Sequence, residues 1–264
     1  MKIRIATYNI HKGVSSFGSR PRIVALKQAL TAMQADIYFL QEVQGRHDTL
    51  AARHAAHWPG EAQHDFLAGD SHNAAYGMNA VYDHGHHGNA LLSCFPIASS
   101  RNHDVSDHAY EARGILHCVV HNDGIDVHCY VVHLGLFAGS RRRQTEALIE
   151  AVLHSAPAAS PVIIAGDFND WGNHLSEALR TRLGVVEVFD ERVPSVGMGS
   201  FLRRLRGVRS KIQPARTFPA VLPFLQLDRI YVRGFQIESA EVLHGALWAR
   251  LSDHAPIVAT LQLK

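Results

Sequence analysis

The sequence predicts an α/β (α+β) fold, a four-layer α-β-β-α sandwich with two mixed, mostly antiparallel sheets flanked by helices. Three observations lead to this prediction. Short runs rich in Val, Ile and Tyr recur along the chain, helical patterns lie between some of them, and one pair of runs is joined by a turn sequence. Because hairpins are mixed with helices, a chain of purely alternating βαβ units is excluded, and two packed sheets with helices outside are favoured.

The expected strands extend over the whole chain. Residues 114–121 and 125–132 flank Asn122-Asp123-Gly124, a sequence typical of the tight turn of an antiparallel hairpin. The complete set of strand-like runs is residues 3–8, 36–40, 89–94, 114–121, 125–132, 161–166, 228–232 and 255–263.

Three helices are expected between these strands. Residues 22–34 carry apolar residues at helical spacing. Ser140 is the predicted N-cap of a second helix, in which Leu148, Val152 and other apolar positions recur. Asn173 is the predicted cap of a third, shorter helix that continues through the leucines of residues 175–183.

The length and composition favour one soluble globular domain over residues 1–264. Hydrophobic residues make up 47% of the chain, and no run approaches the roughly 18 to 20 apolar residues that span a bilayer. A removable signal peptide would carry away Asn9, a proposed site residue, so the protein is expected in the cytoplasm. Cys94, Cys118 and Cys129 lie in apolar strand-like runs without a metal-binding or disulfide pattern, and they are expected to be reduced thiols of the core.

The net charge of +2 gives no overall field that would attract a polyanion. Residues 201–212 form one local basic cluster, in which apolar residues recur at helical spacing opposite Arg and Lys. Such a segment suits an anionic membrane surface or a phosphate backbone. A solvated loop over the sheet edge is the alternative, because Gly207 in its middle weakens a helix.

Short polar motifs follow or precede the strand-like runs. Asp167 and Asn169 are two residues apart after an apolar run, and alternate side chains of an extended backbone point to the same side. Asp253 and His254 place a metal-binding carboxylate beside an imidazole that can carry a proton near neutral pH. The ordered series is Thr7-Tyr-Asn-Ile-His11, Leu40-Gln-Glu-Val43, Val132-His-Leu-Gly135, Ala165-Gly-Asp-Phe-Asn169, Leu227-Asp-Arg-Ile-Tyr231 and Leu251-Ser-Asp-His-Ala-Pro256. Oxygen ligands, amides and imidazoles at strand ends are what a divalent-metal phosphoesterase requires.

In this series the chain resembles the endonuclease/exonuclease/phosphatase superfamily, which includes DNase I, exonuclease III-type AP endonucleases, neutral sphingomyelinases and inositol polyphosphate 5-phosphatases. The resemblance covers residues 3–262 and points to the bacterial cytosolic branch. It implies a site for Mg²⁺, with Mn²⁺ able to substitute. Glu42 would be the principal metal ligand, with Asn9 beside it and Asp253 contributing directly or through water.

The resemblance also implies the catalytic groups. Asp167 would position or deprotonate the attacking water, and Asn169 would hydrogen-bond that water or the phosphate. His254 would stabilise the pentacovalent phosphorane, with its ring oriented by Asp228. His133 stands where DNase I, the sphingomyelinases and the phosphatases have His and the AP endonucleases have Tyr. This departure argues against AP-site cleavage, and for His133 as a phosphate contact or leaving-group acid.

Other polar residues are assigned around this site. Asn89 and Arg113 precede strands at points where relatives place substrate-side groups, so both are expected to bind phosphate; a carboxylate clamp is the alternative for Arg113. His11 is expected outside the site, and the His-rich residues 84–87 in a solvated loop near it. Trp171 either stacks on a base or head group or packs against its own loop.

The leading functional hypothesis is a Mg²⁺-dependent phosphodiesterase that acts on nucleic acid, like a DNA endonuclease, by in-line water attack. The second is hydrolysis of a phospholipid or small phosphoester, with residues 201–212 touching an anionic membrane. A non-catalytic binding module is disfavoured because the polar series is intact. No obligate protein partner is expected.

Overall fold

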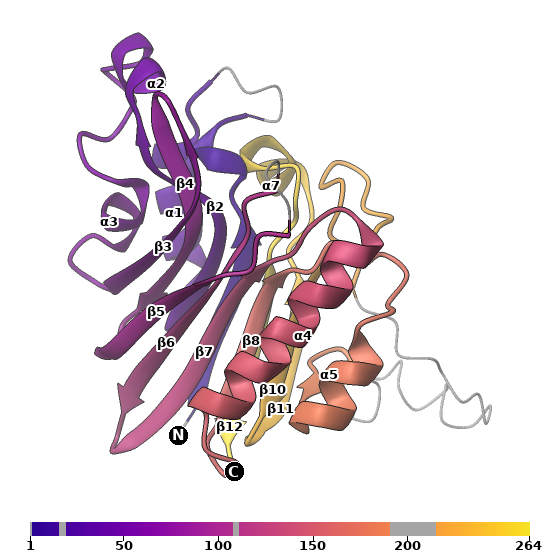
Figure 1. The fold of residues 1–264 in the computed structure, drawn as a ribbon. Coiled ribbons are helices and arrows are strands. Elements are labelled where there is room, and N and C mark those ends of the chain that lie inside the picture. Colours follow the sequence, from indigo (N-terminus) through magenta and orange to yellow (C-terminus); the bar gives the residue numbers. More distant parts are fainter. Residues whose placement is uncertain (1, 16–19, 108–110, 191–214) are drawn as a thin grey trace.

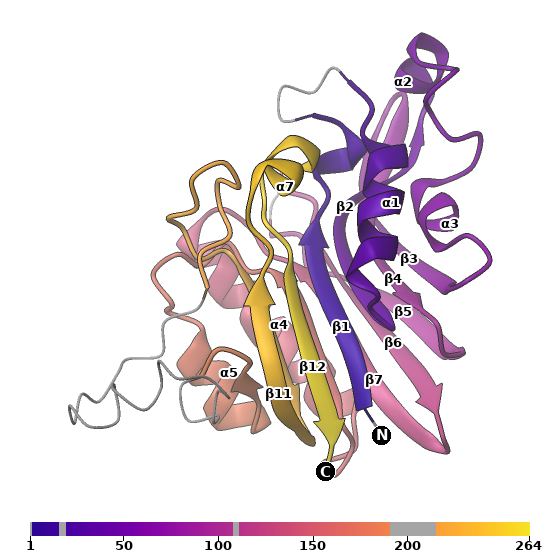
Figure 2. The ribbon, with the colours of Figure 1, turned by 180° about the vertical axis from the view of Figure 1, so that it is seen from behind.

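The computed structural model describes residues 2–15, 20–107, 111–190 and 215–264, so the basic segment 201–212 lies outside the described residues. Two six-stranded sheets pack face to face, and helices cover the outer side of each sheet (Figures 1 and 2). The predicted four-layer α-β-β-α sandwich is confirmed.

The first sheet has the strand order β11-β12-β1-β2-β4-β3. β1 and β2 are parallel, and the other neighbouring pairs are antiparallel. Its strands are β1 (Lys2–Asn9), β2 (Ile37–His47), β3 (Asn73–Tyr82), β4 (Gly85–Ser93), β11 (Phe235–Val242) and β12 (Ile257–Leu263).

The second sheet has the strand order β5-β6-β7-β8-β10-β9. Here β7 and β8 are parallel, and the other pairs are antiparallel. Its strands are β5 (Ile97–Asp104), β6 (Gly114–Asn122), β7 (Ile125–His133), β8 (Val162–Asp167), β9 (Val186–Glu187) and β10 (Asp228–Arg233).

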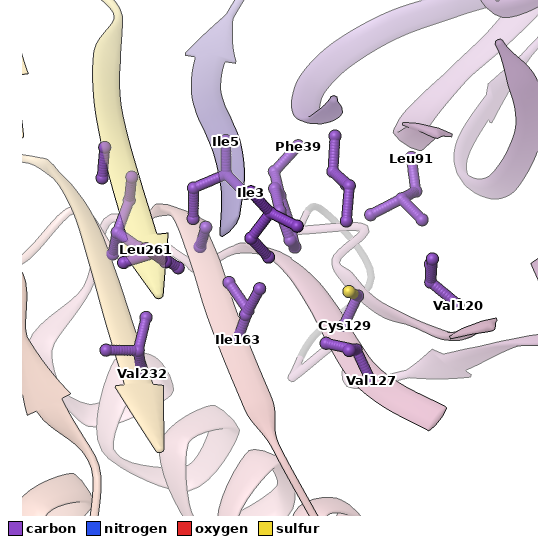
Figure 3. Packing of buried hydrophobic residues seen from close by; sticks show 14 of the residues in the cluster. Ile3, Ile5, Phe39, Leu91, Val120, Val127, Cys129, Ile163, Val232 and Leu261 are labelled. Carbon is purple, nitrogen blue, oxygen red and sulfur yellow. The ribbon is translucent and has the colours of Figure 1, made fainter. Parts of the chain in front are cut away.

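The central core lies between the two sheets, where side chains from both interdigitate (Figure 3). Ile3 and Ile5 of β1 point into this core, whereas Ala6 and Tyr8 of the same strand point to the helices outside. Side chains of a strand alternate between faces, so a strand covered on both sides reads as a nearly continuous apolar run. This burial explains why the sequence of β1 is so easily recognised as a strand.

Helices cover both outer faces. α1 (Ile23–Met33) and α3 (Gln63–Ala68) pack on the first sheet, and α4 (Ala138–Ser155) and α5 (Ser176–Leu183) pack on the second. The shorter elements are η1 (His11–Gly13), α2 (Asp48–Arg53) and α7 (Ala246–Leu251). Within the described ranges, no helix is long and apolar enough to cross a membrane.

All eight expected strands and the 122–124 hairpin turn are present, but several details of the prediction are wrong. The second helix begins at Ala138, and Ser140 donates from its hydroxyl to Asp107 rather than capping the helix. The third helix begins at Ser176, so Asn173 is not its N-cap. Asn173 lies in the preceding loop and accepts a hydrogen bond from the Ser176 hydroxyl. Cys118 and Cys129 are buried free thiols as expected, whereas Cys94 is exposed.

Four strands were not predicted: β3, β5, β9 and β11. β5 is an edge strand with the sequence Ile-Ala-Ser-Ser-Arg-Asn-His-Asp, and most of its side chains are exposed. Such a strand has no apolar alternation to identify it, since it forms only when its neighbour β6 supplies hydrogen bonds.

One edge of the sandwich collects the polar motifs. β1, β7 and β8 end there, β2 passes the end of β1 at Gln41, and β10 and β12 begin there, at the upper edge in Figures 1 and 2. Both chain termini lie at the opposite end.

Candidate active site

Three neighbouring strands of the second sheet place His133, Asp167 and Asp228 in one row. His133 at the end of β7 is paired with Asp167 at the end of β8, and Asp228 at the start of β10 is paired with the same Asp167. Paired residues on neighbouring strands point to the same face of a sheet. The strand register alone therefore brings these three buried side chains together.

His254 reaches this row from the segment that precedes β12. Its Nδ1 atom lies 2.7 Å from Oδ2 of Asp228, and its Nε2 atom lies 3.7 Å from Oδ2 of Asp167. The Nε2 atom of His133 lies 3.6 Å from that same Asp167 oxygen. Asp167 therefore stands between two imidazoles, one of which is oriented by a second carboxylate.

The surroundings give the two imidazoles different charge states. Burial lowers the pKa of His254, but the carboxylates of Asp228 and Asp167 outweigh it and raise the pKa to about 10. Burial, reinforced by the positive charges of Arg113 and His254, holds the pKa of His133 well below its usual value. Burial also raises the pKa of Asp167 to about 6, against the opposing effect of His254. At neutral pH a protonated His254 and a neutral His133 therefore flank an ionised Asp167.

Asn9 connects the first sheet to this row. Its Nδ2 atom donates a hydrogen bond to Oδ2 of Asp167 at 3.2 Å, and its Oδ1 atom accepts one from the backbone N–H of His11 at 3.1 Å. The Ser252 hydroxyl donates to the backbone oxygen of Asn9 at 2.7 Å. Asn9 thus orients the Asp167 carboxylate and ties the end of β1 to the residue before Asp253.

His11, expected outside the site as a surface histidine or one behind the ligands, contacts the predicted ligand Asp253. Its Nδ1 atom lies 3.2 Å from Oδ1 of Asp253. The hydrogen bond with Asp253 raises the pKa of His11. Burial alone would raise the pKa of Asp253, but the hydrogen bond from His11 and the charge of His254 lower it, so this carboxylate is ionised.

An irregularity of β2 brings Glu42 to the same edge. The pairing of β2 with β4 shifts between Leu40 and Val43, and Glu42 has a φ of 56°. A β-bulge changes the direction in which a side chain points. Residues other than Gly with a positive φ are strained, and they cluster at functional sites. The Glu42 carboxylate lies 3.8 Å from Nζ of Lys12, and its charge acts on His11.

Asn169 uses its amide within the site. It has a φ of 50°, a conformation that Asn tolerates better than most residues. Its Nδ2 atom donates to the backbone oxygen of Leu134 at 2.8 Å, and its backbone N–H donates to Oδ1 of Asp167 at 2.9 Å. Asn169 therefore fixes the second oxygen of Asp167 and joins the ends of β7 and β8.

The two expected phosphate-binding residues are placed differently. Asn89 is fully buried, and its Nδ2 atom donates to the backbone oxygens of Gly114 at 2.8 Å and Val131 at 3.3 Å, so it bridges the two sheets with its amide hydrogens in use. Arg113 is half-buried beside His133, and its Nε atom has no hydrogen-bond partner in the described part of the chain. No described carboxylate forms an ion pair with Arg113.

The sequence matches the profile of the Endonuclease/Exonuclease/phosphatase family over residues 6–254. The chain belongs to the endonuclease/exonuclease/phosphatase family. The matched range contains every residue assigned to the site, from Asn9 to His254. Members of this family are hydrolases that act on phosphoesters.

Relatives resemble this endonuclease/exonuclease/phosphatase protein over nearly its whole length. The protein YbhP of Escherichia coli K12 is 39% identical over 263 residues, which cover 98% of this chain and 96% of YbhP. Among solved structures, an endonuclease/exonuclease/phosphatase from Bacteroides vulgatus superposes with a TM-score of 0.74 at 16% identity and 100% coverage of both chains. The mannosyl-6-phosphatase of Bacteroides thetaiotaomicron gives 0.70 at 15% identity, over 99% of this chain and 100% of the phosphatase. At these identities the structural likeness shows the fold.

The donors of this endonuclease/exonuclease/phosphatase site fit a divalent cation. Glu42 and Asp253 are carboxylates with 18% and 27% exposed side chains, the oxygen donors that Mg²⁺ accepts together with water. Asp167, Asp228 and His254 also bring possible ligand atoms within 4.8 Å of one another, the one such group of three in the described ranges. His254 Nδ1 lies 2.7 Å from Asp228 Oδ2, so within this group these two side chains form a histidine–carboxylate pair beside Asp167.

Sequence reasoning missed three further residues of the site. His87 lies on β4, so residues 85–87 form part of a strand and not the solvated loop that was expected. Burial, followed by the charge of Lys12, lowers the pKa of His87 to about 4. Gln63 of α3 is buried, donates to the backbone oxygen of Lys12 at 2.9 Å and accepts from the backbone N–H of Gln44 at 2.9 Å. Lys12 itself was overlooked, although its place between His11 and the glycine at position 13 was a possible signal of a left-handed turn.

Proposed function

We propose that this protein is a Mg²⁺-dependent phosphodiesterase that hydrolyses its substrate by in-line attack of water. One observation supports this proposal most directly: a single oxygen of Asp167 faces Asn9, His133 and His254. The distances from Oδ2 of Asp167 are 3.2 Å to the Asn9 amide nitrogen, 3.6 Å to His133 and 3.7 Å to His254. A carboxylate held in this way can orient a water molecule and accept its proton.

Each residue of the row has its own task. Asp167, with a pKa of about 6, is ionised at neutral pH and accepts the proton of the attacking water. Protonated His254 donates a hydrogen bond to the negative charge that develops on the phosphate, while Asp228 holds its ring. His133 is neutral and therefore contacts the phosphate as a hydrogen-bond donor rather than as an acid. Arg113, whose Nε has no hydrogen-bond partner among the described residues, would supply a further donor near His133.

Glu42 and Asp253 would hold the cation, with Asn9 beside them. When bound, Mg²⁺ or Mn²⁺ supplies positive charge that offsets the charge of the phosphate. The low pKa of Asp253 keeps this carboxylate ready to bind without prior loss of a proton. Asn9 links the two halves of the site, because the same side chain orients Asp167.

Nucleic acid is the substrate class that the sequence favours, with an activity like that of a DNA endonuclease. A phospholipid is the second candidate, because exposed apolar side chains lie on the segments around the site. The cytoplasm stays the predicted location.

The experiment is hydrolysis of bis(p-nitrophenyl) phosphate by the purified protein with EDTA, Mg²⁺ or Mn²⁺, followed by duplex DNA, single-stranded DNA, RNA and phosphatidylglycerol vesicles. Hydrolysis should require the metal and fall by roughly a hundredfold or more in His254→Ala. His244→Ala, which changes an exposed histidine before α7, should have normal activity. A wild-type protein that cleaves none of these substrates with either metal would contradict the proposal.

A further inference from the structure

Exposed apolar side chains gather on three segments beside the active site. These segments are residues 134–143 after β7, residues 168–176 after β8 and residues 215–227 before β10, all at the upper edge of the sandwich (Figures 1 and 2). Exposed apolar groups that lie beside a site often mark an interaction surface. We call this group the apolar rim; its members, with their exposed fractions, are Leu136 (59%), Phe137 (65%), Trp171 (54%), Val221 (80%), Leu222 (74%) and Phe224 (59%).

Contacts within the described residues hold the rim beside the catalytic groups. Arg141 donates to the backbone oxygen of Leu136, and its guanidinium lies 4.8 Å from the centre of the Trp171 ring, so it joins the first two segments. In the third segment, the backbone N–H of Ala220 donates to the backbone oxygen of Asp253 at 2.7 Å. The ring of Phe218 lies 5.0 Å from that of His254. The rim therefore borders the side chains that are proposed to bind phosphate.

The exposed charges of the same segments are all positive. Asp170 is the one acidic residue in these three ranges, and it is 1% exposed. Arg142, Arg143 and Arg216 are exposed, although Arg143 is paired with Asp107. Within these three ranges the rim thus combines apolar groups with exposed cations and has no exposed carboxylate, although the exposed Glu177 follows the second range. This combination complements a negatively charged apolar phase.

We propose that the apolar rim docks on the surface of an anionic phospholipid bilayer and presents the phosphodiester of a lipid head group to Asp167 and His254. This inference rests on the proposed phosphodiesterase function. Phe218 and Leu225 form an isolated antiparallel bridge, so the exposed Val221, Leu222 and Phe224 lie on one loop between them, a shape suited to insertion into a deformable bilayer. Stacked bases of nucleic acid would need free aromatic faces, but half of the rim is aliphatic, and Arg141 lies over the Trp171 ring.

The test is co-sedimentation with vesicles of phosphatidylglycerol and phosphatidylcholine in EDTA, so that binding is measured without turnover. The test variant is Val221→Ser/Leu222→Ser. The matched control is Val24→Ser/Leu153→Ser, which removes the same two residue types from exposed positions on α1 and α4 that are 50% and 51% exposed. The wild type and the control should bind mixed vesicles, and the test variant should bind at least roughly tenfold more weakly. Vesicles of phosphatidylcholine alone should bind the wild type less well, because they lack the negative charge.

Hydrolysis of bis(p-nitrophenyl) phosphate separates this inference from the proposed function. The test variant should hydrolyse this soluble diester like the wild type, because the side chains of Val221 and Leu222 are 80% and 74% exposed. Absent vesicle binding by the wild type, or equal losses in the test and control variants, would overturn membrane docking even if the diester is cleaved. A test variant that binds vesicles normally but cleaves single-stranded DNA poorly would overturn it in favour of base stacking. Vesicle binding without diester hydrolysis in the wild type would support docking and refute the phosphodiesterase.

Discussion

Nδ1 of His254 lies 2.7 Å from Oδ2 of Asp228, and the two side chains are 7% and 1% exposed. The hydrogen bond with Asp228 fixes the orientation of the His254 ring, and the buried carboxylate favours the protonated form of the imidazole. Asp228 leads β10 and His254 precedes β12, so the pair also joins the two sheets of the sandwich. The positive charge of His254, which we assign to catalysis, therefore depends on the packing of the two sheets.

Asp228→Asn should lower kcat by on the order of a hundredfold with little change in KM, because it weakens the charge of His254 in the transition state. Asp126→Asn is the matched control, since Asp126 forms a 2.8 Å pair with His121 on the exposed surface. Steady-state kinetics on bis(p-nitrophenyl) phosphate measures both. A rise in KM with little change in kcat would instead mean that Asp228 contributes to substrate binding in the ground state.

The stability of the metal-free protein should fall in alkaline solution because of His254. Its pKa is raised from 6.5 to about 10, so the folded state holds the proton more tightly than the unfolded state. The contribution is fully present below pH 6.5 and is lost as the pH rises through about 10. Urea unfolding in EDTA at pH 7 and pH 10.5 should show a loss of a few kcal/mol that His254→Gln largely lacks. Equal losses in the two proteins would show that His254 is not the responsible group.

Glu187 should give a pH dependence in the neutral range. Burial raises the pKa of this fully buried carboxyl from 4.5 to about 7, although Arg229 opposes the shift. The folded state again binds the proton more tightly, so this contribution is present below pH 4.5 and is lost as the pH rises through about 7. Between pH 5 and pH 8, Glu187→Gln should gain on the order of 2 kcal/mol of unfolding free energy relative to the wild type. A constant difference across that range would refute the assignment.

Arg229→Met should destabilise the protein by about 3 to 5 kcal/mol. The guanidinium of Arg229 is fully buried, and its removal would leave buried hydrogen-bond acceptors without a donor. Arg229 donates to the backbone oxygens of Asp170 and Gln226 and to the side chains of Asn173 and Ser176. Urea unfolding at neutral pH measures the change. The control Arg182→Met removes exposed ion pairs between α5 and α4 and should cost under about 1 kcal/mol. Similar values for the two variants would mean that the buried network contributes little.

The sequence could predict those site residues that lie at the ends of strands. His133, Asp167 and Asp228 each end or begin an apolar run, and strand register then aligns them without further information. The Asp228–His254 pair followed from the family resemblance and has the expected geometry.

Local backbone conformation was the part that sequence could not supply. Glu42 was expected as a ligand, but the bulge and positive φ that carry it to the edge have no signature in Leu40-Gln-Glu-Val43. His11 reaches Asp253 because residues 11–13 form a left-handed turn, which Gln63 stabilises by a hydrogen bond to the backbone oxygen of Lys12, 51 residues away in sequence. Asn89 was expected before a strand, but it lies within β4, where its amide serves the packing of the two sheets.

The most direct test of metal-dependent phosphodiester hydrolysis is the turnover of Glu42→Gln at saturating Mg²⁺. This change removes one negative charge and barely alters the shape of the side chain. We predict an unchanged circular dichroism spectrum, loss of Mn²⁺ binding by calorimetry and at least a hundredfold lower hydrolysis of bis(p-nitrophenyl) phosphate. Glu177→Gln, at an exposed position of α5, should retain all three properties. A Glu42→Gln protein that binds Mn²⁺ and turns over like the wild type would contradict the account.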